Sequence, residues 1–237
     1  MSSVFAHFRG IFFVALCAGA VAGGVMSVLH QVVRVPLIEQ AEGFEDAAAH
    51  HARNATQATA PPRRDDHGAS GVHRVLLTIL ADLLAGVGFA LLLSAGLALR
   101  GGSISLGQGM VWGVAGFAVF SLAPALGLPP ELPGAESAGL AARQVWWLAT
   151  AAATAGGLAL LAFGYRLILA LMGLVLIAAP HLIGAPQAVV HAAVVPAELT
   201  RTFIMGAMAI NLVFWVVLGA VCVFFMRRFA SSGRPAS

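Results

Sequence analysis

The sequence contains no lysine and little charge of any kind. Charged residues make up 10% of its 237 residues, whereas a soluble domain is usually about 25% charged. At the same time 59% of the residues are hydrophobic and the mean hydropathy is +0.90. This composition excludes an ordinary soluble protein and indicates an integral membrane protein.

Cysteine is also scarce, with only Cys17 and Cys222, both in apolar runs and neither in a CxxC motif. The sequence therefore offers no disulfide framework and no thiolate metal site. A basic stripe with interleaved aromatic residues is missing too, so we expect no nucleic-acid partner. Neither a P-loop nor an HExxH motif is present, which argues against ATP hydrolysis and zincin chemistry.

One short motif is typical of an enzyme. The tetrapeptide GASG at 68–71 resembles the Gly-x-Ser-Gly of rhomboid intramembrane proteases, in which the serine opens a buried helix. Here we expect Ser70 on a polar connector outside the membrane, where four small residues are common. We therefore predict that the protein is not an enzyme.

Six apolar runs are candidates for crossing a bilayer, which takes about 20 residues in a helix. They cover residues 11–33, 75–99, 108–126, 145–164, 167–183 and 203–226. If the fourth and fifth runs formed one helix, that helix would be about 58 Å long, nearly twice the hydrocarbon thickness. Two spans joined by a tight turn at Gly164 are the better interpretation. A bundle of five spans, in which 167–183 is a re-entrant segment, is the alternative. We predict an all-α polytopic membrane helix bundle, with residues 1–237 forming a single membrane domain.

Arginine sets the expected orientation, because cytoplasmic loops carry an excess of positive charge. With six spans and an inner N-terminus, the inner segments contain arginine and no acid. This predicts that both termini lie in the cytoplasm. Nine of the ten carboxylates and seven of the eight histidines then lie on or near the outer side. Such oxygen and nitrogen donors bind divalent cations, so this segregation predicts a face that collects cations.

Most of these donors fall in a long outward-facing loop, predicted over 34–74. Its first part, 36–53, has a helix-forming composition with Pro36 at its start, and 60–71 has the composition of a flexible connector. Glu42, Asp46 and His50 recur every four residues, so on a helix they stack along one face. They are candidate ligands for a weakly held divalent metal, and the polar face of a solvated helix is the alternative interpretation.

Asp82 is the sharpest single signal, because it lies inside the second span, about 10 Å from its outer end. A carboxylate there costs about 2.5–3.5 kcal/mol on insertion scales. It should therefore face the bundle and have a partner. We predict a cation ligand or a carboxylate that exchanges its proton. The alternative is a structural interhelical hydrogen bond, or an ion pair with Arg74 or Arg34.

Three further side chains are predicted to join Asp82 in a polar, metal-binding layer in the outer half of the membrane. His30 lies near the outer end of the first span, and Asn211 lies at a comparable depth in the sixth. His181 lies at the end of the fifth span between Pro180 and Pro186. Helices broken by proline leave carbonyls free to meet ions. A purely structural role for each residue is the alternative.

Glycine spacing in the first span predicts close helix packing. Gly19 and Gly23 are four residues apart, as are Ala20 and Gly24. Such pairs let helix backbones approach closely in lipid.

Several longer segments are distinctive, particularly the two that are bracketed by prolines. They are QVVRVPLI (31–38), AEGFE (41–45), GVGFAL (86–91), PALGLPPELPG (124–134), RQVWW (143–147), PHLIGAP (180–186) and VPAEL (195–199). Through these segments the chain resembles the CbtA family of predicted cobalt transporter subunits along nearly its whole length.

This resemblance implies a bacterial inner-membrane protein that imports cobalt for cobalamin synthesis. It also implies a partner similar to CbtB, a small single-span subunit that carries histidines. We therefore expect Co²⁺ as the transported ion and no permanently bound cofactor. A non-transporting membrane scaffold is the alternative function, because few ionisable groups line the inner half of the predicted spans.

Overall fold

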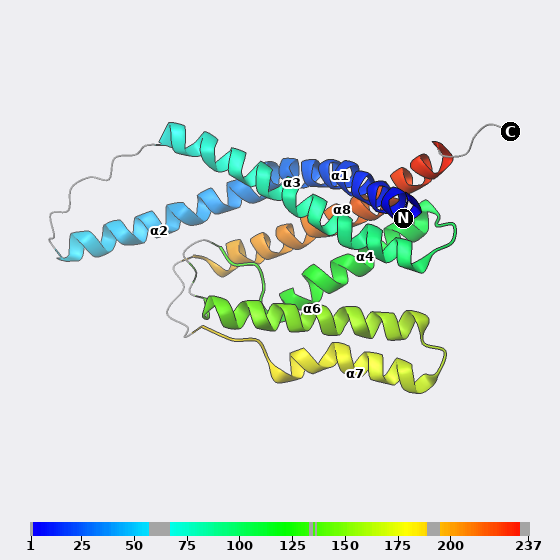
Figure 1. Ribbon diagram of the computed structural model, residues 1–237. Helices are drawn as coiled ribbons and strands as arrows, with labels where there is room; N and C mark the ends of the chain where they lie inside the picture. The colour runs from blue at the N-terminus through cyan, green and yellow to red at the C-terminus, as the bar shows by residue number, and fades with distance from the viewer. Residues whose placement is uncertain (1, 57–66, 133–134, 136, 189–194, 233–237) are drawn as a thin grey trace. The chain divides into compact units, whose positions relative to one another are not determined.

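The computed structural model describes residues 2–56, 67–132, 135, 137–188 and 195–232. Within these ranges every regular element is a helix and no strand occurs (Figure 1). Five of the described helical segments are long and apolar enough to cross a membrane: Phe8–Ala48, Gly71–Arg100, Leu106–Gly127, Leu140–Phe163 and Ala197–Phe229. The predicted all-α membrane fold is confirmed.

The first helix is much longer than one span. Helix α1 (Ser2–Leu29) continues through a π-helical turn, η1 (His30–Arg34), into α2 (Val35–Thr56). Its apolar part alone has 41 residues, or about 61 Å at 1.5 Å per residue. Much of the region expected as a loop is therefore helical, in keeping with its composition. Helix α3 (His67–Arg100) likewise begins inside the expected connector, and 57–66 lie outside the described residues.

Each of the two π-helical turns in the described chain lies just before a proline. The turn η1 ends two residues before Pro36, and η2 (Ala118–Leu122) ends two residues before Pro124. Proline has no N–H to donate, and its ring crowds the carbonyl four residues earlier. A single wide turn can absorb this lost hydrogen bond within a helix. We attribute both turns to these prolines, since α4 (Leu106–Phe117) also continues through η2 into α5 (Ala123–Gly127).

The chain forms two compact units that are interleaved in sequence. Unit 1 comprises Met1–Val32, Thr59–Val114 and Ile210–Ser237, and unit 2 comprises Val33–Ala58 and Ala115–Ala209. Their boundaries fall inside η1, α4 and α8 (Ala197–Ser232), so each of these helices contributes to both units. The single membrane domain over 1–237 stays a prediction.

In unit 1, helix α1 packs along α3 at a glycine-rich crossing (Figure 1). An added Cβ at Gly23 would lie 2.7 Å from the Asp82 carbonyl oxygen, and one at Gly86 would collide with the Gly19 carbonyl. The predicted close approach at Gly19 and Gly23 is confirmed. Gly24 has open space instead, with nothing within 4 Å of an added Cβ, so the predicted second pair does not mark this crossing.

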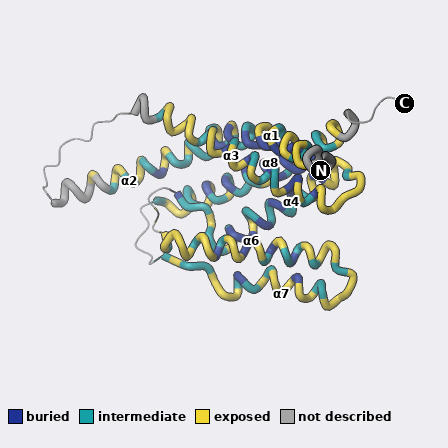
Figure 2. The backbone as a smooth tube through the Cα atoms, in the orientation of Figure 1, coloured by how far each residue is buried: buried dark blue, intermediate teal, exposed yellow. Residues whose placement is uncertain are grey.

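The second contact surface of unit 1 involves the C-terminal part of α8. Phe89 of α3 packs its ring 4.9 Å from that of Trp215 and 6.2 Å from that of Phe214. Both α8 rings are almost completely buried. Figure 2 shows buried stretches, in dark blue, along α1, α3 and α8. Ser94 donates a hydrogen bond of 3.5 Å to the Cys222 sulfur. These contacts hold α3 against the unit 1 part of α8.

In unit 2, α6 (Leu140–Phe163) and α7 (Leu167–Ile183) form a helical hairpin (Figure 1). An added Cβ at Gly157 would lie 2.6 Å from the Gly173 carbonyl oxygen, so the two backbones touch. The predicted turn at Gly164 is confirmed. With 17 residues, α7 is about 25 Å long, slightly shorter than a hydrocarbon core of about 30 Å. The five-span alternative therefore stays open.

Helix α2 also belongs to unit 2 and has a buried side. Ala41 is fully buried in a cluster with Leu132 and Phe203. Arg34 lies over the Phe203 ring, with its guanidinium carbon 5.2 Å from the ring centroid. The acidic Glu39 and Asp46 of the same helix are exposed. This amphipathic pattern explains why a helix as polar as α2 remains folded.

Candidate functional site

The crossing of α1 and α3 carries polar groups as well as glycines. On the α1 side, small or polar residues recur every three or four positions: Gly19, Gly23, Ser27 and His30. On the α3 side they recur every four positions: Asp82, Gly86, Ala90 and Ser94. Residues at this spacing share one face of a helix, and all eight of these residues are buried in the described structure.

Asp82 makes two hydrogen bonds across this crossing, both through the same oxygen. His30 Nδ1 lies 3.0 Å from Asp82 Oδ2, and Ser27 Oγ donates to Asp82 Oδ2 at 3.0 Å. His30 and Asp82 are each only 6% exposed, and Ser27 is 5% exposed. The short Asp82 side chain reaches both partners because Gly23 lets the two backbones come together.

This geometry defines what each group can do. An ionised carboxylate only accepts hydrogen bonds, so His30 donates from Nδ1 when Asp82 is ionised. In a neutral imidazole with its proton on Nδ1, the lone pair lies on Nε2. Metal-ligating histidines almost always donate their other ring N–H in this way, often to a carboxylate. His30 Nε2 is therefore a candidate metal ligand, and Asp82 is the group that orients it.

The pair has few other strong ligands around it. Among the residues that the structure describes, no group of three or more His, Cys, Asp or Glu side chains could hold a metal ion. A cation at His30 would therefore need further ligands from outside these residues.

Sequence reasoning singled out Asp82 and His30 separately but did not identify Ser27. The expected alternative was an interhelical hydrogen bond of Asp82 or an ion pair with Arg74 or Arg34. The structure contains interhelical hydrogen bonds, with His30 and Ser27 as the partners across the crossing. Ser27 could have been found from its spacing. It lies four residues after Gly23 and three before His30, on the face that the glycines predict to pack.

The sequence of this crossing lies inside a recognised family. A family model described as "Probable cobalt transporter subunit (CbtA)" matches residues 8–227, which include α3 and most of α1. The chain belongs to the CbtA family. No curated protein and no solved structure matches it. Because the chain belongs to this family, cobalt is the cation to consider at the buried His30–Asp82 pair.

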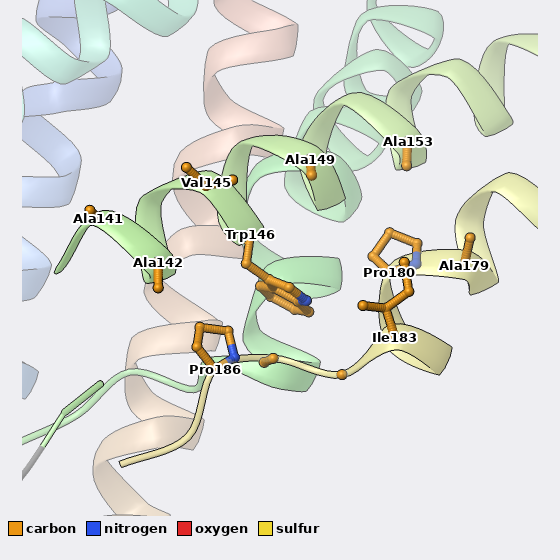
Figure 3. Close-up of a pocket in the computed structure, with 12 residues that line it drawn as sticks. Ala141, Ala142, Val145, Trp146, Ala149, Ala153, Ala179, Pro180, Ile183 and Pro186 are labelled. Atoms are coloured by element: carbon orange, nitrogen blue, oxygen red, sulfur yellow. The ribbon is translucent and has the colours of Figure 1, made fainter. Parts of the chain in front are cut away.

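His181 lies in unit 2, in the last turn of α7 after Pro180. Its ring meets the Trp146 ring edge to face, with centroids 6.0 Å apart. Trp146 projects from α6 into an open groove of about 760 Å³ at the end of α7 (Figure 3). The groove has an apolar lining that includes Ala149, Ala153, Pro180 and Pro186.

The two proline-bracketed segments of the CbtA chain meet around Trp146. An added Cβ at Gly127 would lie 2.7 Å from an atom of the Trp146 ring and 2.9 Å from the Ala185 Cβ. Gln187 Nε2 also donates to the Gly127 carbonyl at 3.5 Å. His181 thus has a packing partner, while its role as a metal ligand stays a prediction. It belongs to a different unit from Asp82.

The remaining predicted ligands lie on two other helices. Glu42, Asp46 and His50 follow one another along α2 at the predicted helical spacing, with Asp46 and His50 exposed. Asn211 lies on the unit 1 part of α8 and is partly exposed. Metal binding by these four residues stays a prediction.

Proposed function

We propose that this CbtA protein is the membrane component through which Co²⁺ is taken up, and that His30 Nε2 ligates the passing ion. The observation that carries the proposal is the buried contact between His30 Nδ1 and Asp82 Oδ2 at 3.0 Å. A carboxylate inside a membrane helix is costly and usually marks an ion or proton pathway. Here Asp82 also orients the imidazole and balances the positive charge of the cation.

In the proposed mechanism, exposed carboxylates such as Glu39 and Asp46 face outward and raise the local cation concentration. The ion exchanges part of its water shell for His30 at the α1–α3 crossing. In this proposal the protein lies in a bacterial inner membrane with both termini in the cytoplasm. The membrane potential then drives the doubly charged ion inward. That driving force is about 4–5 kcal/mol per 100 mV.

A partner subunit is part of the proposal. The family description names a subunit, and the described structure gathers few strong ligands. A small single-span protein with histidines, similar to CbtB, would supply further imidazoles. Cobalt taken up in this way would serve cobalamin synthesis.

Whole-cell uptake of ⁵⁷Co tests the role of the pair. We expect His30→Gln and Asp82→Asn to lower the uptake rate about 10–100-fold, the range for lost ligands and their orienting groups. His73→Gln is the matched control, because His73 lies on α3 but is exposed. Normal uptake by both test variants, at normal membrane levels, would overturn the proposed pathway.

A non-transporting scaffold is the second candidate function. It is favoured by the lack of any three-donor metal group among the described residues. Purified protein in proteoliposomes, with and without the small partner, separates the two functions. Cobalt entry that requires this chain supports transport, whereas entry through the partner alone, at the same rate, supports the scaffold.

A further inference from the structure

The middle of α6 carries three buried polar groups that the proposed cation site does not use. They are the indole N–H of Trp146 and the hydroxyls of Thr150 and Thr154. Trp146 is 8% exposed, Thr150 0% and Thr154 3%. None of these three polar atoms has a hydrogen-bond partner within the described structure.

The two threonines differ from every other threonine whose side chain is described. Thr78, Thr200 and Thr202 each donate to the carbonyl four residues earlier, at 2.9, 3.4 and 2.8 Å. This is the usual way in which a threonine hydroxyl in a membrane helix finds a partner. Thr150 and Thr154 are the most buried of the five, yet they leave that bond unmade. Their hydroxyls therefore point to a ligand outside the protein chain.

The spacing of the three groups indicates which ligand fits. They recur every four residues on one face of α6, so the hydroxyls of the two identical threonine side chains are about 6 Å apart along the axis. That distance is about twice a 2.8 Å hydrogen bond, which allows one water molecule to bridge Thr150 and Thr154. The three groups are polar and buried on a largely apolar helix, where an unbonded polar group is costly.

The chemistry of the groups favours water over a bare cation. The Trp146 indole is a donor only and would repel a cation, while a threonine hydroxyl both donates and accepts. Water can satisfy both kinds of group. Helix α6 contains no carboxylate, so it offers no charge to replace the water shell of a divalent ion.

We propose that Trp146, Thr150 and Thr154 form a water-binding file along the buried face of α6, at which a passing divalent cation retains its water ligands. The binding of water stands independently of transport, whereas its use by a cation rests on the proposed function. The file would add a hydrated segment in unit 2 to a chain whose buried His30–Asp82 pair lies in unit 1.

Substitution of the hydroxyls by methyl groups tests the water file. If the hydroxyls lie in a dry core, Thr150→Val and Thr154→Val remove an unbonded polar group and raise the melting temperature. If they bind water, each change leaves the melting temperature unchanged or lowers it. Thr202→Val is the matched control, because Thr202 already has a carbonyl partner.

Radiolytic hydroxyl-radical labelling of the protein in vesicles provides a readout that needs no cobalt. Bound water next to Trp146 should make this residue react faster than Trp215, which is 2% exposed. We expect the Thr150→Val, Thr154→Val double variant to lose most of this extra labelling. Labelling of Trp146 that persists unchanged, together with a higher melting temperature, would overturn the water file.

Uptake of ⁵⁷Co by the same double variant then separates the two parts of the proposal. Loss of both labelling and uptake supports a file that serves the cation. Loss of labelling with full uptake would overturn the role in transport. If the wild-type chain moves no cobalt, the labelling and the melting temperatures still decide whether water binds.

Discussion

The backbone of Gly23 in α1 lies directly against the backbone of Asp82 in α3. A single added carbon at Gly23 would lie 2.7 Å from the Asp82 carbonyl oxygen. The closest packing of the two helices and the buried His30–Asp82 pair are therefore one structural feature. Because an Asp side chain is short, it reaches His30 and Ser27 only where the partner helix has no side chain.

Gly23→Ala should destabilise the protein, because the new methyl group overlaps the α3 backbone. Overpacking of this kind costs about 1–3 kcal/mol. The matched control is Gly24→Ala, where an added Cβ meets nothing within 4 Å. That change should be neutral or stabilising by up to about 1 kcal/mol, since Ala favours helix over Gly. Melting temperatures in detergent measure both effects, and equal values for the two variants would contradict this packing.

Asp82→Ala should cost about 1–3 kcal/mol of stability, because it leaves two buried polar side chains without their partner. Ser27→Ala should cost less, since Asp82 keeps its contact with His30. In the double variant the two losses should not add, because both changes break the same hydrogen bond. Strictly additive losses in thermal unfolding would show that Ser27 and Asp82 do not interact.

Pro36→Ala tests the cause of the η1 turn that contains His30. The new residue supplies a backbone N–H that can bond the Val32 carbonyl, so we expect an α-helical register through 30–34. His30 would then turn away from Asp82. We predict uptake of ⁵⁷Co lowered about 10–100-fold, with a melting temperature that is unchanged or raised.

The control for this change is Pro129→Ala, which removes an exposed proline that lies outside the helices. It should leave uptake at the wild-type rate. Full uptake by Pro36→Ala would show that the wide turn does not place His30.

The carboxylates that we propose to face outward should differ in their effect on cation collection. Glu131 is already paired, with its Oε2 3.0 Å from Arg143 and 2.7 Å from the Ser137 hydroxyl that donates to it. Glu131→Gln should therefore leave the half-saturating cobalt concentration unchanged. The exposed Glu39 and Asp46 have no such ion pair with any residue in the described ranges. Their joint neutralisation should raise that concentration about 2–3-fold at low salt.

Uptake rates measured over a range of cobalt concentrations and salt provide the check. The effect of Glu39→Gln, Asp46→Asn should disappear at high ionic strength, because exposed charges are screened. A larger effect from Glu131→Gln than from this pair would contradict the assigned roles.

Hydropathy and glycine spacing were enough to predict the helices, the α6–α7 turn and the packing face of α1. The extent of α2 was harder to predict, since its polar residues suggest a loop although Ala41 and its neighbours bury one side. The π-helical turns were not predicted, because a proline in an apolar run normally suggests that a helix ends.

The candidate site was predicted in part. The burial cost of a charge singled out Asp82, and its depth suggested a polar partner in the same layer. Which residue fills that role depends on which faces of α1 and α3 meet, and only the three-dimensional packing fixes that. Predicted ligands on different elements, such as His181 and Asp82, fell into different units because depth in a membrane carries no lateral information.

The most direct test of metal ligation is cobalt K-edge X-ray absorption on the purified, Co²⁺-loaded protein. Imidazole bound to cobalt gives a distinct outer-shell scattering pattern, which should be present in the wild type and in the His73→Gln control. We predict that His30→Gln loses this imidazole contribution and that Asp82→Asn weakens it. Identical spectra for the wild type and His30→Gln would contradict the assignment of His30 as the cobalt ligand.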